Sequence, residues 1–172
     1  MRNFAGVFLL ALLPTPWGLA FADICWGNLP PTNPDQVYVR HGNGTVTDTS
    51  TGLMWKACAE GQAGSACSGE ANTFTWAEAL SWAEATVFGG HDDWRLPNVK
   101  ELSGLVEECR FTPAININFF PNTPNAEFWS SSPQVQESFY TPGAWWVDFY
   151  IGYTSHDPRE LTAHVRLVRD PF

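Results

Sequence analysis

One segment of the chain, residues 91–102, determines where a strand must stop and a helix must begin. The triplet Trp94-Arg95-Leu96 alternates apolar and charged side chains, as a strand does, and Pro97 follows it directly. Proline has no backbone N–H and favours an extended conformation in the residue before it, so we expect the strand to stop there. Asn98 is a favourable N-cap, and Glu101 is placed to complete a capping box. The sequence therefore predicts a junction between a strand and a helix.

The same segment carries three acidic residues, Asp92, Asp93 and Glu101. Carboxylate oxygens are the ligands that Ca²⁺ prefers, so this cluster could hold a calcium ion. We favour a simpler interpretation, in which one aspartate turns or caps the chain and another carboxylate pairs with Arg95, because an unpaired buried charge is costly. We therefore expect no cofactor here and interpret the segment as architectural.

Residues 1–22 have the pattern of a secretory signal peptide. A single charge, Arg2, precedes the apolar run 8–13, and the segment closes on the small-x-small sequence Ala20-Phe21-Ala22. Prolines at positions 14 and 16 interrupt the run before it reaches the roughly 20 residues that a membrane span needs. We therefore expect cleavage after Ala22, no membrane span in the product, and a periplasmic or secreted protein.

Removal of 22 residues from 172 leaves 150, which suits one domain, and we expect a lead-in over 23–41 and a folded domain over 42–172. Without Arg2, eight basic residues stand against 18 acidic ones, a formal charge of −10. Binding to nucleic acid requires clustered Lys and Arg to neutralise phosphates. The charge therefore excludes nucleic acid as an expected partner.

Four cysteines, an even number in an exported chain, predict disulfides rather than a metal site. Three pairings are open. We favour Cys58 with Cys67, which closes a short loop, and Cys25 with Cys109, which ties the lead-in to the end of the second helix. The second bridge closes the longer loop, so it should contribute more stability, on the order of 4 kcal/mol.

The periodicity of apolar residues places the remaining elements. A capping box of Thr75 and Glu78 opens a helix over 74–85, which Gly89-Gly90 ends. Its buried stripe should comprise Trp76, Leu80, Ala83 and Val87. A second helix should run from Asn98 to about residue 108. Alternating or β-branched runs predict short strands over residues 37–40, 45–48, 51–56, 128–132, 144–150 and 163–169.

Alternation in the strand over 144–150 predicts a ligand-binding face. If this strand pairs with the last one, Arg166 can meet Asp148 across the sheet. Aromatic rings stack on sugars, while a carboxylate and a guanidinium bind hydroxyl groups. The predicted face comprises Trp146, Asp148, Tyr150, Arg166 and Trp129. The alternative is that a loop covers this face and that the Asp148–Arg166 pair is purely structural.

Several motifs occur together, in one order, between residues 42 and 169: Thr51-Gly52-Leu53-Met54-Trp55, Thr75-Trp76, Asp93-Trp94-Arg95-Leu96-Pro97-Asn98 with Glu101-Leu102, Phe120-Pro121-Asn122-Thr123, Trp129-Ser130-Ser131 and Val165-Arg166-Leu167-Val168-Arg169. In these motifs the chain resembles the family named for the C-terminal domain of the bacterial collagen-like adhesin Lcl. The resemblance implies a compact, C-type-lectin-like α+β domain, with two helices packed on small, mostly antiparallel sheets. It implies no established reaction.

The sequence contains no nucleophile elbow, no zinc-binding His-Glu-x-x-His helix and no phosphate-binding glycine loop. We therefore predict an exported, non-catalytic binding module, whose partner is a carbohydrate or an envelope or extracellular protein. One alternative is an enzyme or accessory domain of the formylglycine-generating type, which the Arg-Leu-Pro segment resembles but which needs a specific cysteine pair. Another alternative is a structural component of an envelope assembly.

Overall fold

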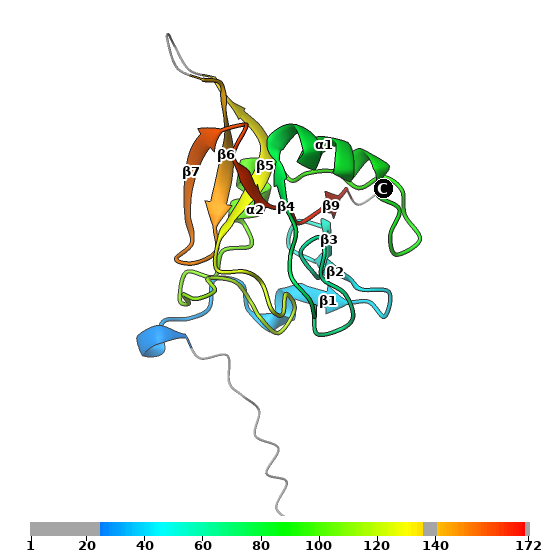
Figure 1. The fold of residues 1–172 in the computed structure, drawn as a ribbon. Coiled ribbons are helices and arrows are strands. Elements are labelled where there is room, and N and C mark those ends of the chain that lie inside the picture. Colours follow the sequence, from blue (N-terminus) through cyan, green and yellow to red (C-terminus); the bar gives the residue numbers. More distant parts are fainter. Residues whose placement is uncertain (1–24, 136–140, 171–172) are drawn as a thin grey trace, which may run out of the picture.

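The structure, a computed structural model, describes residues 25–135 and 141–170. It is a compact α+β fold with two helices and two sheets (Figure 1). The predicted signal peptide lies outside the described residues. Within the described part of the chain, no helix is both long enough and apolar enough to cross a membrane.

The first sheet has four strands in the order β1-β2-β3-β9, and every pairing in it is antiparallel. Its strands are β1 (Tyr38–Arg40), β2 (Thr45–Asp48), β3 (Met54–Lys56) and β9 (Val168–Arg169). Short 3-10 turns, η1 (Trp26–Asn28) and η2 (Asp35–Val37), precede it. The hairpin of β1 and β2 and the following strand β3 confirm the sequence prediction.

The second sheet has five strands in the order β4-β8-β5-β6-β7. Its strands are β4 (Thr73–Thr75), β5 (Glu127–Gln134), β6 (Gly143–Asp148), β7 (Tyr153–Pro158) and β8 (Thr162–His164). The pairing of β5 with β8 is parallel and the other pairings are antiparallel. The sequence analysis missed β4 and β7, because each presents polar or exposed residues rather than an apolar run.

Helix α1 (Trp76–Ala85) begins at the predicted capping box. The Thr75 hydroxyl accepts from the Glu78 N–H at 3.4 Å, and the Glu78 carboxylate accepts from the Thr75 N–H at 2.8 Å. Ala79 and Ala83 are its buried residues. The predicted burial of Val87 is wrong, because the helix ends before it and the side chain is 76% exposed.

Helix α2 (Val99–Ser103) also begins as predicted. The side-chain oxygen of Asn98 accepts from the N–H groups of Lys100 and Glu101, and the Glu101 carboxylate accepts from the Asn98 N–H at 2.7 Å. The helix ends at Ser103 rather than near residue 108, which corrects the prediction. Gly104 follows, and glycine is a poor helix former. The apolar residues beyond it, Leu105 and Val106, are nevertheless buried in the core.

The last predicted strand, 163–169, is instead two strands that belong to different sheets. Between β8 and β9 the chain crosses from the second sheet to the first (Figure 1). The carbonyl groups of Val165 and Leu167 accept from the N–H groups of Glu60 and Lys56, which follow or end β3. The crossing segment is therefore part of the core and fastens the two sheets together.

The junction around Pro97 is held by arginine–carboxylate pairs. Arg95 forms an isolated bridge with Val168 rather than a strand, and its guanidinium donates to both oxygens of Glu101 at 2.8 and 2.9 Å. It also binds Asp170. Arg169 binds both oxygens of Asp93 at 2.7 and 2.8 Å. These contacts confirm the expectation that a carboxylate pairs with Arg95.

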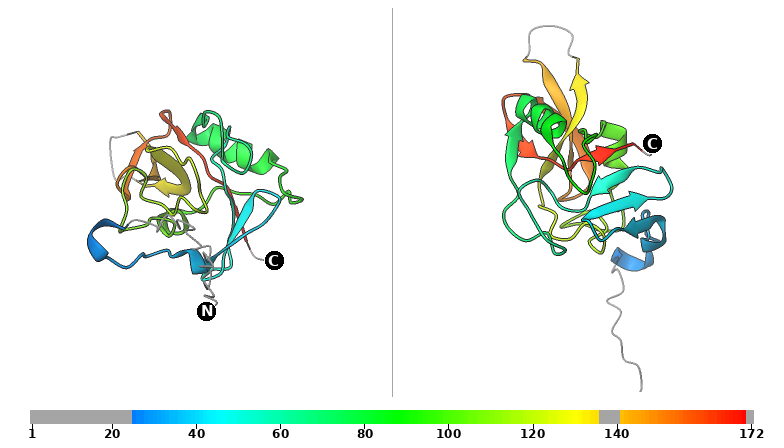
Figure 2. Two further views of the ribbon diagram at one scale, coloured as in Figure 1. Left: turned by 90° about the horizontal axis from the view of Figure 1, so that it is seen from below. Right: turned by 90° about the vertical axis from the view of Figure 1, so that its right-hand side faces the viewer.

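Both favoured disulfides are present, Cys25–Cys109 and Cys58–Cys67. The lead-in runs along the outside of the domain before it enters β1 (Figure 2). The fully buried carboxylate of Glu107 accepts from the backbone N–H groups of Thr32 and Asn33, at 2.7 and 2.8 Å. Together the disulfide and this carboxylate hold the lead-in against the domain.

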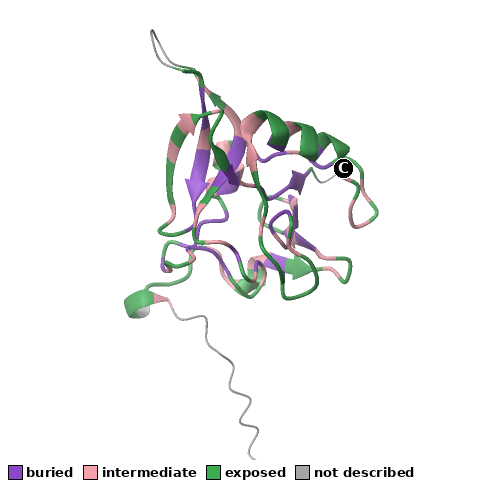
Figure 3. Ribbon diagram, in the orientation of Figure 1, coloured by how far each residue is buried: buried purple, intermediate pink, exposed green. Residues whose placement is uncertain are grey.

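Buried residues line β6 in the second sheet, and exposed residues line the outer face of α1 (Figure 3). Two apolar clusters fill the interior. Trp129 and Trp146 pack with α1 on one face of β5 and β6, and Phe128 and Val147 pack with α2 on the other. Both faces of β5 and β6 are therefore largely covered, whereas the edge strand β7 is mostly exposed.

Candidate functional site

The predicted meeting of Arg166 and Asp148 is wrong. Strand β5 lies between β6, which carries Asp148, and β8, which precedes Arg166. The Arg166 side chain is fully buried and donates to the carbonyl oxygens of Lys56 and Ala57 and to the hydroxyl of Thr123. Burial lowers its pKa, and the charge of Glu60 opposes that shift. Arg166 therefore supports the interior instead of facing a ligand.

Of the other residues of the predicted face, three are buried and one is exposed. Trp129 and Trp146 are paired across β5 and β6 but are only 1% and 5% exposed. Their indole N–H groups donate to the carbonyl of Phe74 and to the Asp157 carboxylate. Asp148 is buried and accepts from the backbone N–H of Tyr150, which alone among the five is exposed. The five residues do not form one open surface.

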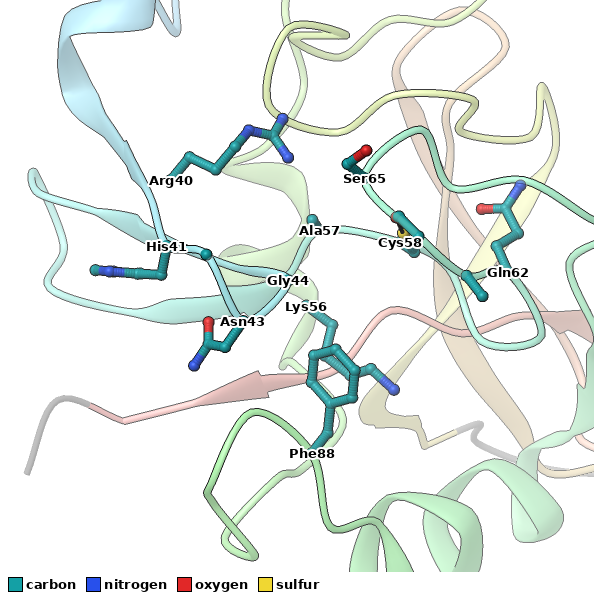
Figure 4. A pocket seen from close by; sticks show the side chains of 13 residues that line it. Arg40, His41, Asn43, Gly44, Lys56, Ala57, Cys58, Gln62, Ser65 and Phe88 are labelled. Atoms are coloured by element: carbon teal, nitrogen blue, oxygen red, sulfur yellow. Dashed lines mark hydrogen bonds between the residues drawn. The ribbon is translucent and has the colours of Figure 1, made fainter.

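The structure instead has a cavity of about 460 Å³ beside the first sheet (Figure 4). One side is the turn between β1 and β2, and the opposite side is the loop that Cys58 and Cys67 close. The floor lies at the end of β3, and a further wall comes from the loop after α1. The residues that define these parts are Arg40, Gly44, Ala57, Cys58, Ser65 and Phe88.

Local geometry fixes the floor and the Phe88 wall. The N–H of Ala57 donates to the carbonyl oxygen of Gly44 at 3.0 Å, which joins the turn to β3. Gly44 has φ +86°, and a Cβ at this position would lie 2.9 Å from the Phe88 ring. Glycine is therefore needed both for the turn conformation and for the close approach of the ring.

The opposite wall depends on the disulfide loop. Cys58 and Cys67 close it covalently, and Ala63 and Ser68 exchange backbone hydrogen bonds of 2.9 and 2.8 Å within it. The side chain of Gln62 donates to the carbonyl of Asn122 at 2.9 Å, which ties the loop to a distant segment. The wall is therefore fixed in place before any ligand arrives.

The guanidinium of Arg40 and the hydroxyl of Ser65 lie across the mouth of the cavity from one another (Figure 4). One guanidinium nitrogen of Arg40 donates to the carbonyl of Asn118. The guanidinium carbon lies 5.6 Å from the centre of the Phe119 ring. These contacts orient the side chain but use only part of its donor capacity, because a guanidinium has five N–H donors.

Lys56 and His41 also line the cavity, but each is paired with another side chain. The Lys56 ammonium pairs with Glu60 at 2.6 Å and sits 4.4 Å from the centre of the Phe88 ring. The His41 ring points away from the cavity and hydrogen-bonds Thr47 at 2.8 Å (Figure 4). The cavity thus offers an apolar floor with hydrogen-bond donors at its rim. Such a site suits a ligand with an apolar surface and exposed oxygen atoms.

Sequence analysis did not identify this cavity, although it predicted both walls. The turn at residues 42–44 and the Cys58–Cys67 loop are each visible in the sequence. Strands β2 and β3 are antiparallel, so the start of β2 lies beside the end of β3. The turn that precedes β2 and the disulfide loop that follows β3 therefore come together. Two short loops that flank adjacent antiparallel strands were the signal that could have located it.

Two of the three carboxylates considered as calcium ligands are bound by arginines, Asp93 by Arg169 and Glu101 by Arg95, and the third, Asp92, is exposed. Among the described residues one group has metal-ligand spacing, Cys25, Glu107 and Cys109. Its two sulfur atoms form a disulfide, and its carboxylate binds backbone N–H groups. Neither group is arranged as an open set of ligands.

The fold and the cavity define a compact α+β domain that forms a ligand-sized hollow between a hairpin turn and a disulfide loop. The chain belongs to the Lcl C-terminal domain family, whose match covers residues 44–169. Comparison with curated proteins gives no match. The C-type-lectin-like character that the resemblance implies stays a prediction.

Proposed function

We propose that this protein is an exported, non-catalytic module that binds a carbohydrate or a protein surface through the cavity beside Arg40. The observation that carries the proposal is the placement of the Arg40 guanidinium and the Ser65 hydroxyl across a cavity with an apolar floor. Oxygen atoms of a sugar or of a protein side chain would accept hydrogen bonds at the rim, and the apolar part would lie against Phe88 and Ala57.

Export is supported by the two disulfides, because disulfides persist in oxidising compartments. The predicted signal peptide agrees, and we place the protein in the periplasm or outside the cell. Membership of a family named for an adhesin domain also favours a binding role.

The state of the cysteines favours a binding module over an enzyme of the formylglycine-generating type. That alternative needs a reactive cysteine pair, whereas all four cysteines of the chain are joined in disulfides, of which Cys67 and Cys109 are buried. Lys56 and His41, which could transfer protons, are held by Glu60 and Thr47 instead. The alternative of a structural envelope component predicts that changes at the cavity leave its function intact.

A glycan array and a capture experiment with envelope proteins test the proposal. We compare the purified protein with Ser65→Trp, which fills the mouth of the cavity, and with Ser68→Trp, which adds the same bulk to the same loop outside the cavity lining. Wild type and Ser68→Trp should bind the same ligand, with or without Ca²⁺, and Ser65→Trp should not. Equal binding by both variants, or no binding by wild type, would refute the proposal.

A further inference from the structure

A second hollow lies on the face of the second sheet that α2 covers, where α2 contacts β6 and β7. It measures about 400 Å³ and is lined by Val99, Lys100, Ser103, Trp145 and Thr154. Trp145 and Thr154 share one face of the sheet, because Trp145 pairs with His156 and Val147 pairs with Thr154. Helix α2 has only five residues, so it leaves the end of this face uncovered.

Trp145 differs from the other tryptophans of the second sheet. Of the eight tryptophans in the described part of the chain, five donate their indole N–H to a protein acceptor: Trp76, Trp82, Trp94, Trp129 and Trp146. The Trp145 indole N–H has no acceptor among residues 25–135 and 141–170. A partly exposed ring with an unused donor is suited to a ligand that combines an apolar face with hydroxyl groups.

The groups around the ring match this chemistry. The His156 ring packs edge-on against the Trp145 ring, with 5.2 Å between the ring centres and an interplanar angle of 78°. This contact helps to orient the indole plane. The Ser103 and Thr154 hydroxyls lie 3.2 Å apart and can each donate or accept. Lys100 adds an ammonium that pairs with no carboxylate among the described residues. Donors and acceptors thus converge beside one aromatic face.

From this arrangement we infer that the groove between α2 and β7 binds one pyranose residue of a neutral glycan, stacked on Trp145. A pyranose offers C–H groups to the ring and hydroxyl groups to Ser103, Thr154 and the indole N–H. The net charge of −9 repels acidic polysaccharides at long range, which favours a neutral ligand. This site does not rest on the proposed function, because it shares no lining residue with the cavity beside Arg40.

The test is a titration of the purified protein with cellohexaose, maltohexaose and chitohexaose, observed through the NMR signal of the Trp145 indole N–H. At least one of these neutral probes should shift that signal. Trp145→Ala should weaken binding about tenfold, since aromatic stacking is lost. The control Trp26→Ala, which removes an exposed tryptophan from η1, should bind as wild type does.

A second variant tests the groove independently, in case Trp145→Ala does not fold. The double change Ser103→Ala with Thr154→Val removes both hydroxyls while keeping the shape, and it should weaken binding by about threefold to tenfold. The inference is overturned if no neutral probe shifts the indole signal, or if folded Trp145→Ala and the double variant bind as tightly as wild type.

Discussion

The guanidinium of Arg166 donates a hydrogen bond to the carbonyl oxygen of Ala57, the residue at the floor of the cavity. Arg166 also donates to the carbonyl of Lys56 and to the hydroxyl of Thr123 at 2.8 Å. Its guanidinium carbon lies 5.0 Å from the centre of the Phe120 ring and 5.7 Å from the centre of the Phe128 ring. A buried arginine therefore braces the backbone from which the site is built.

Replacing Arg166 should destabilise the fold. In Arg166→Met the carbonyl groups of Lys56 and Ala57 lose their donor in a site without solvent, so we expect the free energy of unfolding to fall by roughly 2–4 kcal/mol. Urea denaturation measures this change. The matched variant Arg40→Met alters an exposed arginine and should change stability by less than about 0.5 kcal/mol. Equal stability of Arg166→Met and wild type would contradict the bracing role.

Glu107 should prove essential for holding the lead-in. In Glu107→Gln an amide N–H₂ replaces one of the two oxygens that accept from Thr32 and Asn33. One backbone donor then meets another donor, and we expect a loss of about 1–3 kcal/mol and faster hydrogen exchange at these two amides. The neighbouring exposed Glu108→Gln is the control, and unchanged exchange in Glu107→Gln would count against the clamp.

Acid should weaken the junction around Pro97. Hydrogen bonds from Arg169 lower the pKa of Asp93, and those from Arg95 lower the pKa of Asp170. Burial acts to raise the pKa of Glu101, but the bonds from Arg95 and Asn98 outweigh it and lower that pKa. A carboxylate with a lowered folded-state pKa stabilises the fold above its unfolded-state pKa and loses this contribution as pH falls through the lowered value.

We therefore expect the contribution to be complete above about pH 5 and to decline below about pH 4. Denaturant unfolding between pH 7 and pH 2.5 measures it in wild type and in Glu101→Gln. The stability difference between the two proteins should shrink as the pH falls, because wild-type Glu101 becomes neutral as well. A difference that stays constant over this range would show that its charge contributes nothing.

The two disulfides should differ in their effects. On the loop-entropy model, replacing Cys58 and Cys67 with serine costs roughly 2–3 kcal/mol, and replacing Cys25 and Cys109 costs roughly 4–5 kcal/mol, because the sequence separations are 9 and 84 residues. Thermal unfolding of both double variants gives the order of stability. Only the first variant removes a wall of the cavity, so it alone should lose ligand binding while folded. Loss of binding in both folded variants would contradict this division.

Local features of this chain were predictable because they depend on neighbouring residues. The capping boxes at Thr75 and Asn98, the turn at residues 42–44 and the Cys58–Cys67 loop each involve groups within a few positions of one another. The end of α2 was not predicted correctly, because apolar residues continue at helical spacing beyond Gly104 while the chain turns to place Glu107 under the lead-in.

Strand alternation alone could not show that the predicted ligand-binding face is closed. Alternation in β6 separates Trp145 from Trp146, yet it cannot show which face is covered, and here both faces are packed except at the Trp145 end. Arg166 lies in an apolar run that resembles one strand. The order of strands in the second sheet separates it from Asp148, and that order depends on contacts between distant parts of the chain.

The central claim is that the cavity beside Arg40 is the binding site for a carbohydrate or protein partner. The most direct measurement is an NMR titration of the labelled protein with the strongest ligand from the array or capture experiment. We predict that the largest amide shifts occur at Gly44, Ala57, Ser65 and Phe88, and that Arg40→Ala weakens binding tenfold or more, about the value of a hydrogen bond to a charged group. Shifts confined to other surfaces, or unchanged affinity in folded Arg40→Ala, would contradict the claim.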